Sequence, residues 1–220
     1  MPPADFLQQT IPYFLDHPEL AIVQARWGHS NASSSALTAA QAIALDKHFA
    51  IEQLVRQRAN YFPKFNGSAS VLRRGAVDEV GGWHGDTVTE DLCLSTRLVL
   101  AGWQCQFLNK LVAPAQLPVS IAAYKSQQAR WAQGSLQAIR KYGWQIFLRG
   151  RNWKDWTGRV YALLSMSAYL TNVCVLIMLL LLLPLVLLDY RFSPNLIFLS
   201  IAGIGQPLLF ALARKELYPD

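Results

Sequence analysis

Two long apolar stretches occupy the carboxyl-terminal part of the chain. Residues 161–188 carry no charged side chain over 28 positions, and residues 192–213 form a second uncharged stretch that two prolines and several polar residues interrupt. Because about 20 residues of α-helix cross a bilayer, each stretch predicts a membrane span. Residues 189–191 alone separate them, so we expect a tight two-span hairpin over residues 160–220. The alternative is a buried helix pair of a soluble protein, which seldom reaches this length without a charge.

Basic residues beside these stretches predict their orientation, because cytoplasmic loops carry an excess of Lys and Arg. The connecting loop holds a single basic residue, Arg191. We therefore expect a multi-pass membrane protein with both termini in the cytoplasm. The basic residues at the outer ends are Arg149, Arg151, Lys154 and Arg159 before the first stretch, and Arg214 and Lys215 after the second.

The first 124 residues show two other kinds of apolar pattern. Short runs rich in β-branched residues predict strands, and longer stretches with helical spacing predict helices. Strands that alternate with helices favour a mainly parallel sheet covered by helices, so we predict an α/β fold here. The predicted strands cover residues 20–26, 71–72 and 104–108, and the predicted helices cover residues 35–60, 89–101 and 121–141.

Composition and charge narrow the possible partners. Hydrophobic residues make up 52% of the chain and charged residues 15%, which excludes a disordered protein. The formal net charge is +6, but residues 1–124 hold nine basic and ten acidic side chains, and residues 160–220 hold three of each. Residues 125–159 hold eight basic side chains against Asp155 alone. Because the basic excess is confined to this segment, we expect no nucleic-acid partner.

Several site classes lack their sequence signature. The three cysteines show no C-x-x-C spacing, so they indicate neither a disulfide framework nor a zinc site. His84 and Asp86 are the nearest approach to a metal-ligand spacing, and the pair is too small for a site. No P-loop, G-x-S-x-G or H-E-x-x-H motif occurs. We therefore predict no metal ligands within this chain.

The tripeptide Thr89-Glu90-Asp91 follows a glycine-rich turn and opens a predicted helix. Carboxylates in a first helical turn are stabilised by the free N–H groups and by the positive end of the helix dipole, so a purely structural role is one interpretation. The other is that a carboxylate held beside a loop acts as a general base toward a hydroxyl. The spacing does not decide between them.

The segment 127–131 lies inside the predicted helix 121–141. Gln127, Arg130 and Trp131 are spaced i, i+3, i+4, which predicts that they share one face. An amide, a guanidinium and an indole on one face suit a sugar and its phosphate. An interfacial helix with Trp at the level of the lipid headgroups fits the same spacing.

Basic and aromatic residues are interleaved just before the first apolar stretch. This pattern is typical of a segment that lies on anionic lipid headgroups, so membrane lipids are predicted partners. The residues are Arg140, Lys141, Trp144, Phe147, Leu148, Arg149, Arg151, Trp153, Lys154 and Trp156.

Seven short segments follow one another along the chain: Val23-Gln24-Ala25-Arg26-Trp27, Phe65-Asn66-Gly67-Ser68, Arg73-Arg74, Gly81-Gly82-Trp83, Thr89-Glu90-Asp91, Gly102-Trp103 and Gln127-x-x-Arg130-Trp131. In this order they resemble the second half of a processive family 2 glycosyltransferase of the cellulose-synthase-like, β-mannan (glucomannan) synthase branch. The resemblance covers roughly residues 5–145. The two motifs T-E-D and Q-x-x-R-W, followed by apolar stretches, are the specific part of it.

The resemblance implies a cytosolic catalytic domain of the glycosyltransferase A fold in a plasma (inner) membrane protein. Such enzymes transfer a sugar with inversion from a nucleotide sugar, a UDP- or GDP-hexose, to a β-linked glycan or glycolipid acceptor. Carried over, Asp91 would be the base that deprotonates the acceptor hydroxyl. Thr89 and Glu90 would shape the same loop, Gln127, Arg130 and Trp131 would hold the acceptor end and the leaving diphosphate, and Asn66 and Gly67 would border the acceptor.

Relatives also hold Mg²⁺ or Mn²⁺ with a D-x-D motif that precedes the stretch resembling residues 2–7. The chain begins at Met1, so we expect the metal ligands and much of the donor site to lie outside it, and the chain to be the carboxyl-terminal portion of such an enzyme. The alternative is a non-catalytic membrane protein or synthase subunit that binds glycan or a partner. The predicted regions are a partial catalytic domain (1–124), an acceptor-site helix with a basic aromatic interfacial segment (125–159) and a transmembrane hairpin (160–220).

Overall fold

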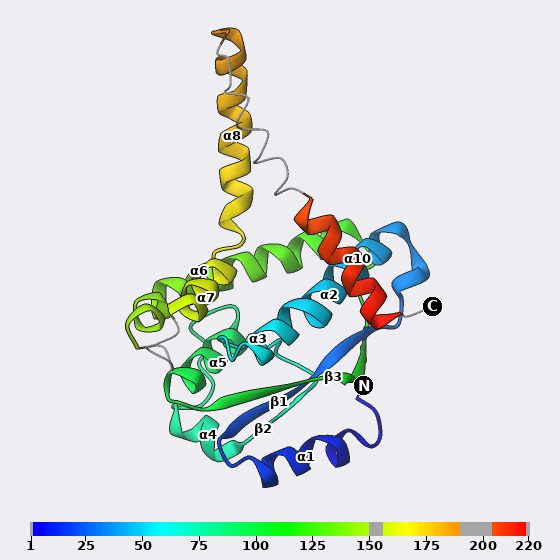
Figure 1. The fold of residues 1–220 in the computed structure, drawn as a ribbon, viewed down its shortest axis with the longest axis vertical. Helices are drawn as coiled ribbons and strands as arrows, with labels where there is room; N and C mark the ends of the chain where they lie inside the picture. Colours follow the sequence, from blue (N-terminus) through cyan, green and yellow to red (C-terminus); the bar gives the residue numbers. More distant parts are fainter. Residues whose placement is uncertain (1, 150–155, 190–203, 219–220) are drawn as a thin grey trace.

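The computed structural model describes residues 2–149, 156–189 and 204–218. Helices and strands alternate through the first half of the chain, and helices alone follow (Figure 1). The elements are α1 (Phe6–Asp16), β1 (Leu20–His29), η1 (Ala32–Ser34), α2 (Ala36–Lys47), η2 (His48–Gln53), α3 (Leu54–Arg58), β2 (Ser70–Leu72), α4 (Arg74–Glu79), α5 (Glu90–Leu100), β3 (Gln104–Ala115), α6 (Ile121–Arg149), α7 (Trp156–Met166), α8 (Leu170–Leu187) and α10 (Gly205–Leu217).

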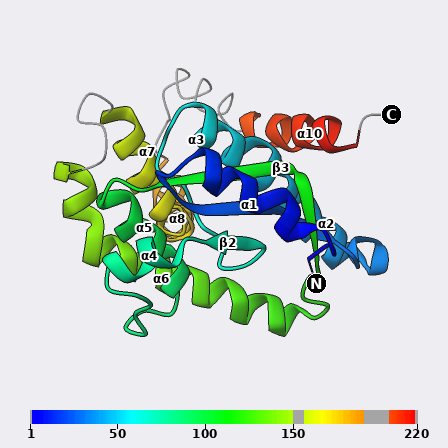
Figure 2. The same cartoon turned by 90° about the horizontal axis from the view of Figure 1, so that it is seen from below.

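The described strands form one sheet in the order β2-β1-β3. β1 pairs with β3 in parallel over its length and with β2 in antiparallel fashion over three residue pairs. The central strand is buried from Leu20 to Ala25, as expected of a strand covered on both faces. Figure 2 shows α1 lying across the sheet from below, where Phe6 packs with Ala25 and Leu111. The α/β class is as predicted, and the antiparallel β2 is a feature that the pattern did not predict.

The predicted helix over residues 35–60 forms as three consecutive pieces, α2, η2 and α3. Ser35 begins it with a capping box, in which its side chain and that of Thr38 bond each other's backbone N–H. The middle piece, η2, is a π-helix. Such a turn is uncommon within a helix and often occurs at functional sites, and here it carries His48, Glu52 and Gln53.

Helix α6 joins the α/β part to the remaining helices. Its buried positions Ser135, Ala138, Tyr142 and Ile146 recur at helical spacing and form one face. Three of them belong to a core cluster with residues of α5 and α7, including Leu92. The helix extends to Arg149, eight residues beyond the predicted end at residue 141.

Helix α8 projects away from the rest of the protein (Figure 1). No residue of α8 is buried, and within the described ranges it is the one helix long and apolar enough to cross a membrane. It covers residues 170–187 of the first apolar stretch, because residues 161–166 belong to α7, which packs on α6.

The second predicted span falls partly outside the described residues. Residues 192–203 are not described, and residues 205–213 belong to α10. That helix packs along α2 and η2, where Lys47 Nζ lies 5.5 Å from the centre of the Phe210 ring. The described structure thus contains one candidate span and a helix lying on the α/β part, so the two-span hairpin and the three region boundaries stay predictions.

Candidate functional site

The motif residues singled out in the sequence gather at one cavity of about 260 Å³ between α2, α5 and α6. Its lining includes Asn66 from the loop before β2, Thr89 and Asp91 from the start of α5, and Gln127 and Trp131 from α6. Three segments that are far apart in the sequence therefore meet at one hollow.

Asp91 lies in the first turn of α5, and its side chain is half-buried in the cavity wall. Its Oδ1 accepts a hydrogen bond of 2.8 Å from the backbone N–H of Leu92. Burial raises the pKa of Asp91, and the charge of Glu90 adds to this effect, while the Leu92 N–H and the Lys64 ammonium oppose it. A carboxylate with a raised pKa is a better proton acceptor.

Gly67 brings the loop of residues 65–68 against this carboxylate. Its φ of 75° lies in the left-handed region that favours glycine. A Cβ added at Gly67 would lie 2.6 Å from Asp91 Oδ2, so no other residue fits without displacing the carboxylate. Gly67 therefore lies directly against the Asp91 carboxylate, and its predicted place beside an acceptor stays a prediction.

Gly134 allows the Thr89 loop to approach α6 just as closely. A Cβ added at Gly134 would lie 2.7 Å from the Cβ of Thr89, and closer still to its Oγ1 and Cγ2. The Thr89 hydroxyl is buried and has no hydrogen-bond partner among the described residues. A glycine inside a helix lowers stability by roughly 1 kcal/mol relative to alanine. At position 134 the glycine allows α6, which carries Gln127 and Trp131, to contact Thr89 closely.

Three of the predicted site residues, Gly67, Glu90 and Arg130, lie outside the cavity lining. Arg130 and Glu90 are exposed. Successive residues of an α-helix are about 100° apart, so Gln127 and Trp131 point within about 40° of each other while Arg130 lies to one side. The prediction that all three share one face holds for Gln127 and Trp131 only.

The cavity also holds residues that the sequence did not single out as site residues. Trp27, Tyr124 and Tyr169 give it flat apolar surfaces beside its amides and hydroxyls, a combination that suits the apolar faces and hydroxyls of a sugar ring. Tyr169, just before α8, donates a 3.0 Å hydrogen bond to Gln128 on α6. The aromatic residues are scattered in the sequence, and Trp27 could have been found from the segment 23–27.

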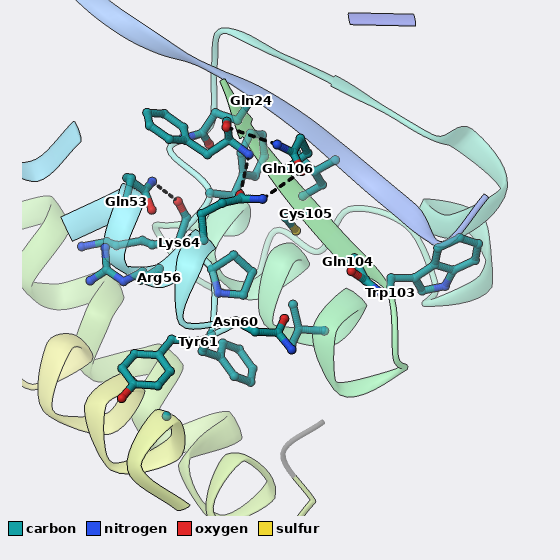
Figure 3. Close-up of a pocket in the computed structure, with 18 of the residues that line it drawn as sticks. Gln24, Gln53, Arg56, Asn60, Tyr61, Lys64, Trp103, Gln104, Cys105 and Gln106 are labelled. Atoms are coloured by element: carbon teal, nitrogen blue, oxygen red, sulfur yellow. Dashed lines mark hydrogen bonds between the residues drawn. The ribbon is translucent and has the colours of Figure 1, made fainter. Parts of the chain in front are cut away.

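Lys64 borders this cavity and a second one of about 320 Å³. Figure 3 shows this second cavity, with Gln24, Gln53 and Lys64 near one another on its wall. Burial lowers the pKa of Lys64, and the nearby charge of Arg56 lowers it further. Its position next to the loop 65–68 is the signal that could have identified it.

The family model "Glycosyl transferase family group 2" matches residues 1–212. The chain belongs to this family. The membership confirms the resemblance that the ordered motifs indicated. It also accounts for residues beyond α6, because the match continues into α10.

Relatives of this chain include plant proteins at about 40% identity. The chain is 40% identical over 158 residues to "Glucomannan 4-beta-mannosyltransferase 7" of Arabidopsis thaliana, covering 70% of this chain and 28% of the relative. It is 39% identical over 145 residues to "Probable glucomannan 4-beta-mannosyltransferase 6" of Oryza sativa subsp. japonica, covering 66% of this chain and 25% of the relative. The chain thus spans less than a third of the length of these relatives.

The fold of the chain is similar to that of a solved structure, "Mannosyltransferase PcManGT from Pyrobaculum calidifontis in complex with GDP-Man and Mn2+". The TM-score is 0.50 at 15% sequence identity, over 99% of this chain and 59% of the other. This likeness concerns the fold, and it agrees with the predicted glycosyltransferase A-like α/β class.

The resemblance to metal-dependent family members implies a divalent metal, and the structure that this fold is similar to holds Mn2+. Among the residues that the structure describes, no group of three or more His, Cys, Asp or Glu side chains could hold a metal ion. The described residues therefore do not provide a metal site by themselves.

Proposed function

We propose that this glycosyl transferase adds a hexose with inversion from a nucleotide sugar to a β-linked glycan acceptor at the membrane surface. The observation that carries the proposal is the meeting of Asp91, Asn66, Gln127 and Trp131 at one cavity with aromatic walls. An acceptor sugar placed there has a carboxylate for its hydroxyl and indole faces for its ring.

Asp91 is the proposed general base. As the acceptor oxygen attacks the anomeric carbon, a new C–O bond forms and the acceptor proton passes to Asp91. The bond from the anomeric carbon to the diphosphate breaks, and the nucleoside diphosphate leaves with the electron pair. The raised pKa of Asp91, which burial causes first of all, supports this role because it favours protonation of the carboxylate during the transfer.

Gln127 and Trp131 are proposed to bind the acceptor end, with Asn66 and Gly67 bordering it. Thr89 and Glu90 shape the loop that carries the base. Arg130 is exposed beside the cavity, a position that suits the leaving diphosphate better than the acceptor ring. The donor is proposed to be a GDP- or UDP-hexose, with GDP-mannose favoured by the names of the relatives and of the similar structure.

The membrane part is proposed to place this site at the cytoplasmic surface of the plasma membrane. Helix α8 supplies a span, and the exposed Trp144, Phe147 and Trp156 on α6 and α7 face solvent in a manner typical of interfacial residues. The proposal also includes a second span within 192–213, which requires α10 to leave its packing on α2 and η2, and a cytoplasmic position of both termini. A reporter fused after Asp220 should be found in the cytosol.

Membranes containing the full chain provide the test. Labelled GDP-mannose or UDP-glucose is supplied with β-1,4-mannotetraose, and transfer and mannotetraose binding are both measured for the wild type and for Asp91→Asn. We expect mannotetraose binding by both proteins, with Trp131→Ala losing most of the binding. Because the described residues do not provide a metal site by themselves, transfer is measured with the amino-terminal half of a related synthase catalytic domain co-expressed, and there we expect transfer by the wild type but not by Asp91→Asn.

Transfer that survives in Asp91→Asn contradicts the assignment of the base. Mannotetraose binding without transfer by the wild type, even with the co-expressed amino-terminal half, favours the alternative function, a membrane protein that binds glycan or joins a synthase as a subunit. A wild-type protein that binds no mannotetraose contradicts the acceptor site itself.

A further inference from the structure

We infer that His48 is a positioning residue of the acceptor cavity, which fixes the loop of residues 65–68 through Asn66 and does so only while its imidazole is unprotonated. The inference takes its functional meaning from the acceptor site proposed above. It rests on a buried chain of hydrogen bonds that runs from β1 through Asn66 to η2.

Two backbone groups fix the direction of this chain. The backbone N–H of Asn66 donates to Gln24 Oε1 at 2.9 Å, so the Nε2 of Gln24 is the end that donates to Asn66 Oδ1 at 2.8 Å. Gln53 Nε2 donates to the carbonyl oxygen of Lys64 at 2.6 Å and also to Asn66 Oδ1 at 2.8 Å. Because Oδ1 already accepts two hydrogen bonds, it has no capacity for a third good one.

The amide nitrogen of Asn66 must therefore face His48. Asn66 Nδ2 lies 3.1 Å from His48 Nε2, and since Nδ2 can only donate, Nε2 must accept. The imidazole proton is then on Nδ1, which lies 3.0 Å from Glu52 Oε2 and donates to it. The network specifies one tautomer of a neutral histidine.

The surroundings of His48 favour this neutral form. Burial lowers the pKa of His48; the hydrogen bond to Glu52 opposes this, and the charges of Lys64 and Arg56 lower it further. Burial alone would raise the pKa of Glu52, but its contacts with His48 and with Lys47, at 2.8 Å, hold it well below its usual value. Helix α10 packs on this side and contributes Gln206 and Phe210, both at Lys47. On the cavity side, Asp91 and Tyr124 are the other titratable groups.

Protonation of His48 breaks the chain at a defined point. With a proton on Nε2, two donors face each other across 3.1 Å, and Asn66 must turn or move away. Turning exchanges Oδ1 and Nδ2, which brings the Asn66 amide group against the Gln24 and Gln53 donors. The loop then loses the contacts that hold Gly67 beside Asp91.

Hydrogen exchange at the backbone amide of Asn66 tests the inference without any sugar. The full chain is placed in lipid nanodiscs, and the protection factor of this amide is measured from pH 4.5 to 7.5. A net hydrogen bond is worth about 1 kcal/mol and an unsatisfied buried group about 1–3 kcal/mol, so we expect protection to fall about tenfold as the pH drops below 6.5. His48→Gln should abolish this step, and Glu52→Gln should move it to lower pH, because the Glu52 charge no longer favours the protonated imidazole.

His29→Gln is the matched control. His29 is also buried, and its Nε2 lies 3.1 Å from Asp46 Oδ1, but it is no part of the Asn66 chain. It should keep the wild-type pH profile at Asn66. A wild-type profile without a step, or one that His48→Gln and Glu52→Gln leave unchanged, overturns the inference. If the protection of the Asn66 amide falls at low pH but the protein binds no mannotetraose, the positioning role of His48 is supported and the proposed function is contradicted.

Discussion

Replacing Gly134 by alanine should separate helix propensity from the close approach of the two motifs. In an exposed helix, alanine in place of glycine gains about 1 kcal/mol. At Gly134 the new Cβ would lie 2.7 Å from the Cβ of Thr89. Rotation of the Thr89 side chain about χ1 does not move its own Cβ, so the backbone of α5 or α6 must shift. Overpacking of this kind costs about 1–3 kcal/mol, so we expect a net loss of up to about 2 kcal/mol.

Gly143→Ala is the control within the same helix. A Cβ there would lie 3.4 Å from Ile139 Cγ2 and 3.7 Å from Leu163 Cδ2, which are ordinary contacts, so this variant should be stabilised by up to about 1 kcal/mol. The two variants should differ by about 1–3 kcal/mol in the free energy of unfolding. Thermal unfolding in nanodiscs measures this, at about 2–4 °C per kcal/mol for a protein of this size. Equal stabilisation by both substitutions would refute the argument that Gly134 is required for contact with Thr89.

Three further predictions concern charge. Because the pKa of His48 is lowered in the folded protein, the unfolded chain binds a proton at His48 at higher pH than the folded chain does. The free energy of unfolding should therefore fall as the pH drops below about 6.5, and urea unfolding should show a weaker fall for His48→Gln. Lys64→Met removes a buried charge that the nearby charge of Arg56 disfavours, so it should raise the melting temperature at pH 7. The same substitution removes a charge that lowers the pKa of Asp91, so the acid limb of the pH profile of sugar transfer should shift to higher pH. Leu179→Arg in α8 should weaken membrane insertion by about 2.5–3.5 kcal/mol, which alkaline carbonate extraction detects as release of the protein from the membrane. Leu15→Arg, at an exposed position of α1, is the control and should stay in the membrane. Its release would indicate a general folding defect.

The parts of the fold that follow from local patterns were predictable. Buried strands in a sheet covered on both faces read as continuous apolar runs, and the first four residues of β1, Leu20–Val23, form such a run. The antiparallel pairing of β2 depends on which edge of β1 is free, and three residues carry no signal for this. The π-helix at η2 was also missed, because helical spacing hardly changes over one wide turn.

The candidate site likewise contains residues that the sequence motifs identify and residues that they do not. Asp91, Thr89 and Trp131 stand in recognisable motifs, so their proximity could be expected from the order of the motifs. Lys64 and His48 lie outside the seven sequence segments, and their place at the cavity depends on long-range packing. Sequence spacing also misplaced Arg130, because i, i+3 and i, i+4 neighbours lie on opposite sides of the first residue.

The basic residues of the segment 125–159 do not all face solvent on one surface, because two of them bind other parts of the protein. Arg159 is buried, and its Nη1 donates a 2.6 Å hydrogen bond to the carbonyl oxygen of Phe147, which ties the start of α7 to the end of α6. Lys141 forms an ion pair with Asp86 in the loop before α5. These two cations therefore contribute to the attachment of α6 and are less available to lipid phosphates.

The exposed residues of α6 identify which part of the segment can meet a membrane. Trp144 is 71% exposed and stacks with Phe147 at a centroid distance of 6.1 Å, and Arg140 is exposed one turn earlier. Arg130 is exposed almost three turns earlier still, beside the cavity. Because an aromatic pair and a cation suit the lipid headgroup region, the carboxyl-terminal half of α6 is the part expected at the bilayer, and its amino-terminal half is left to the acceptor site.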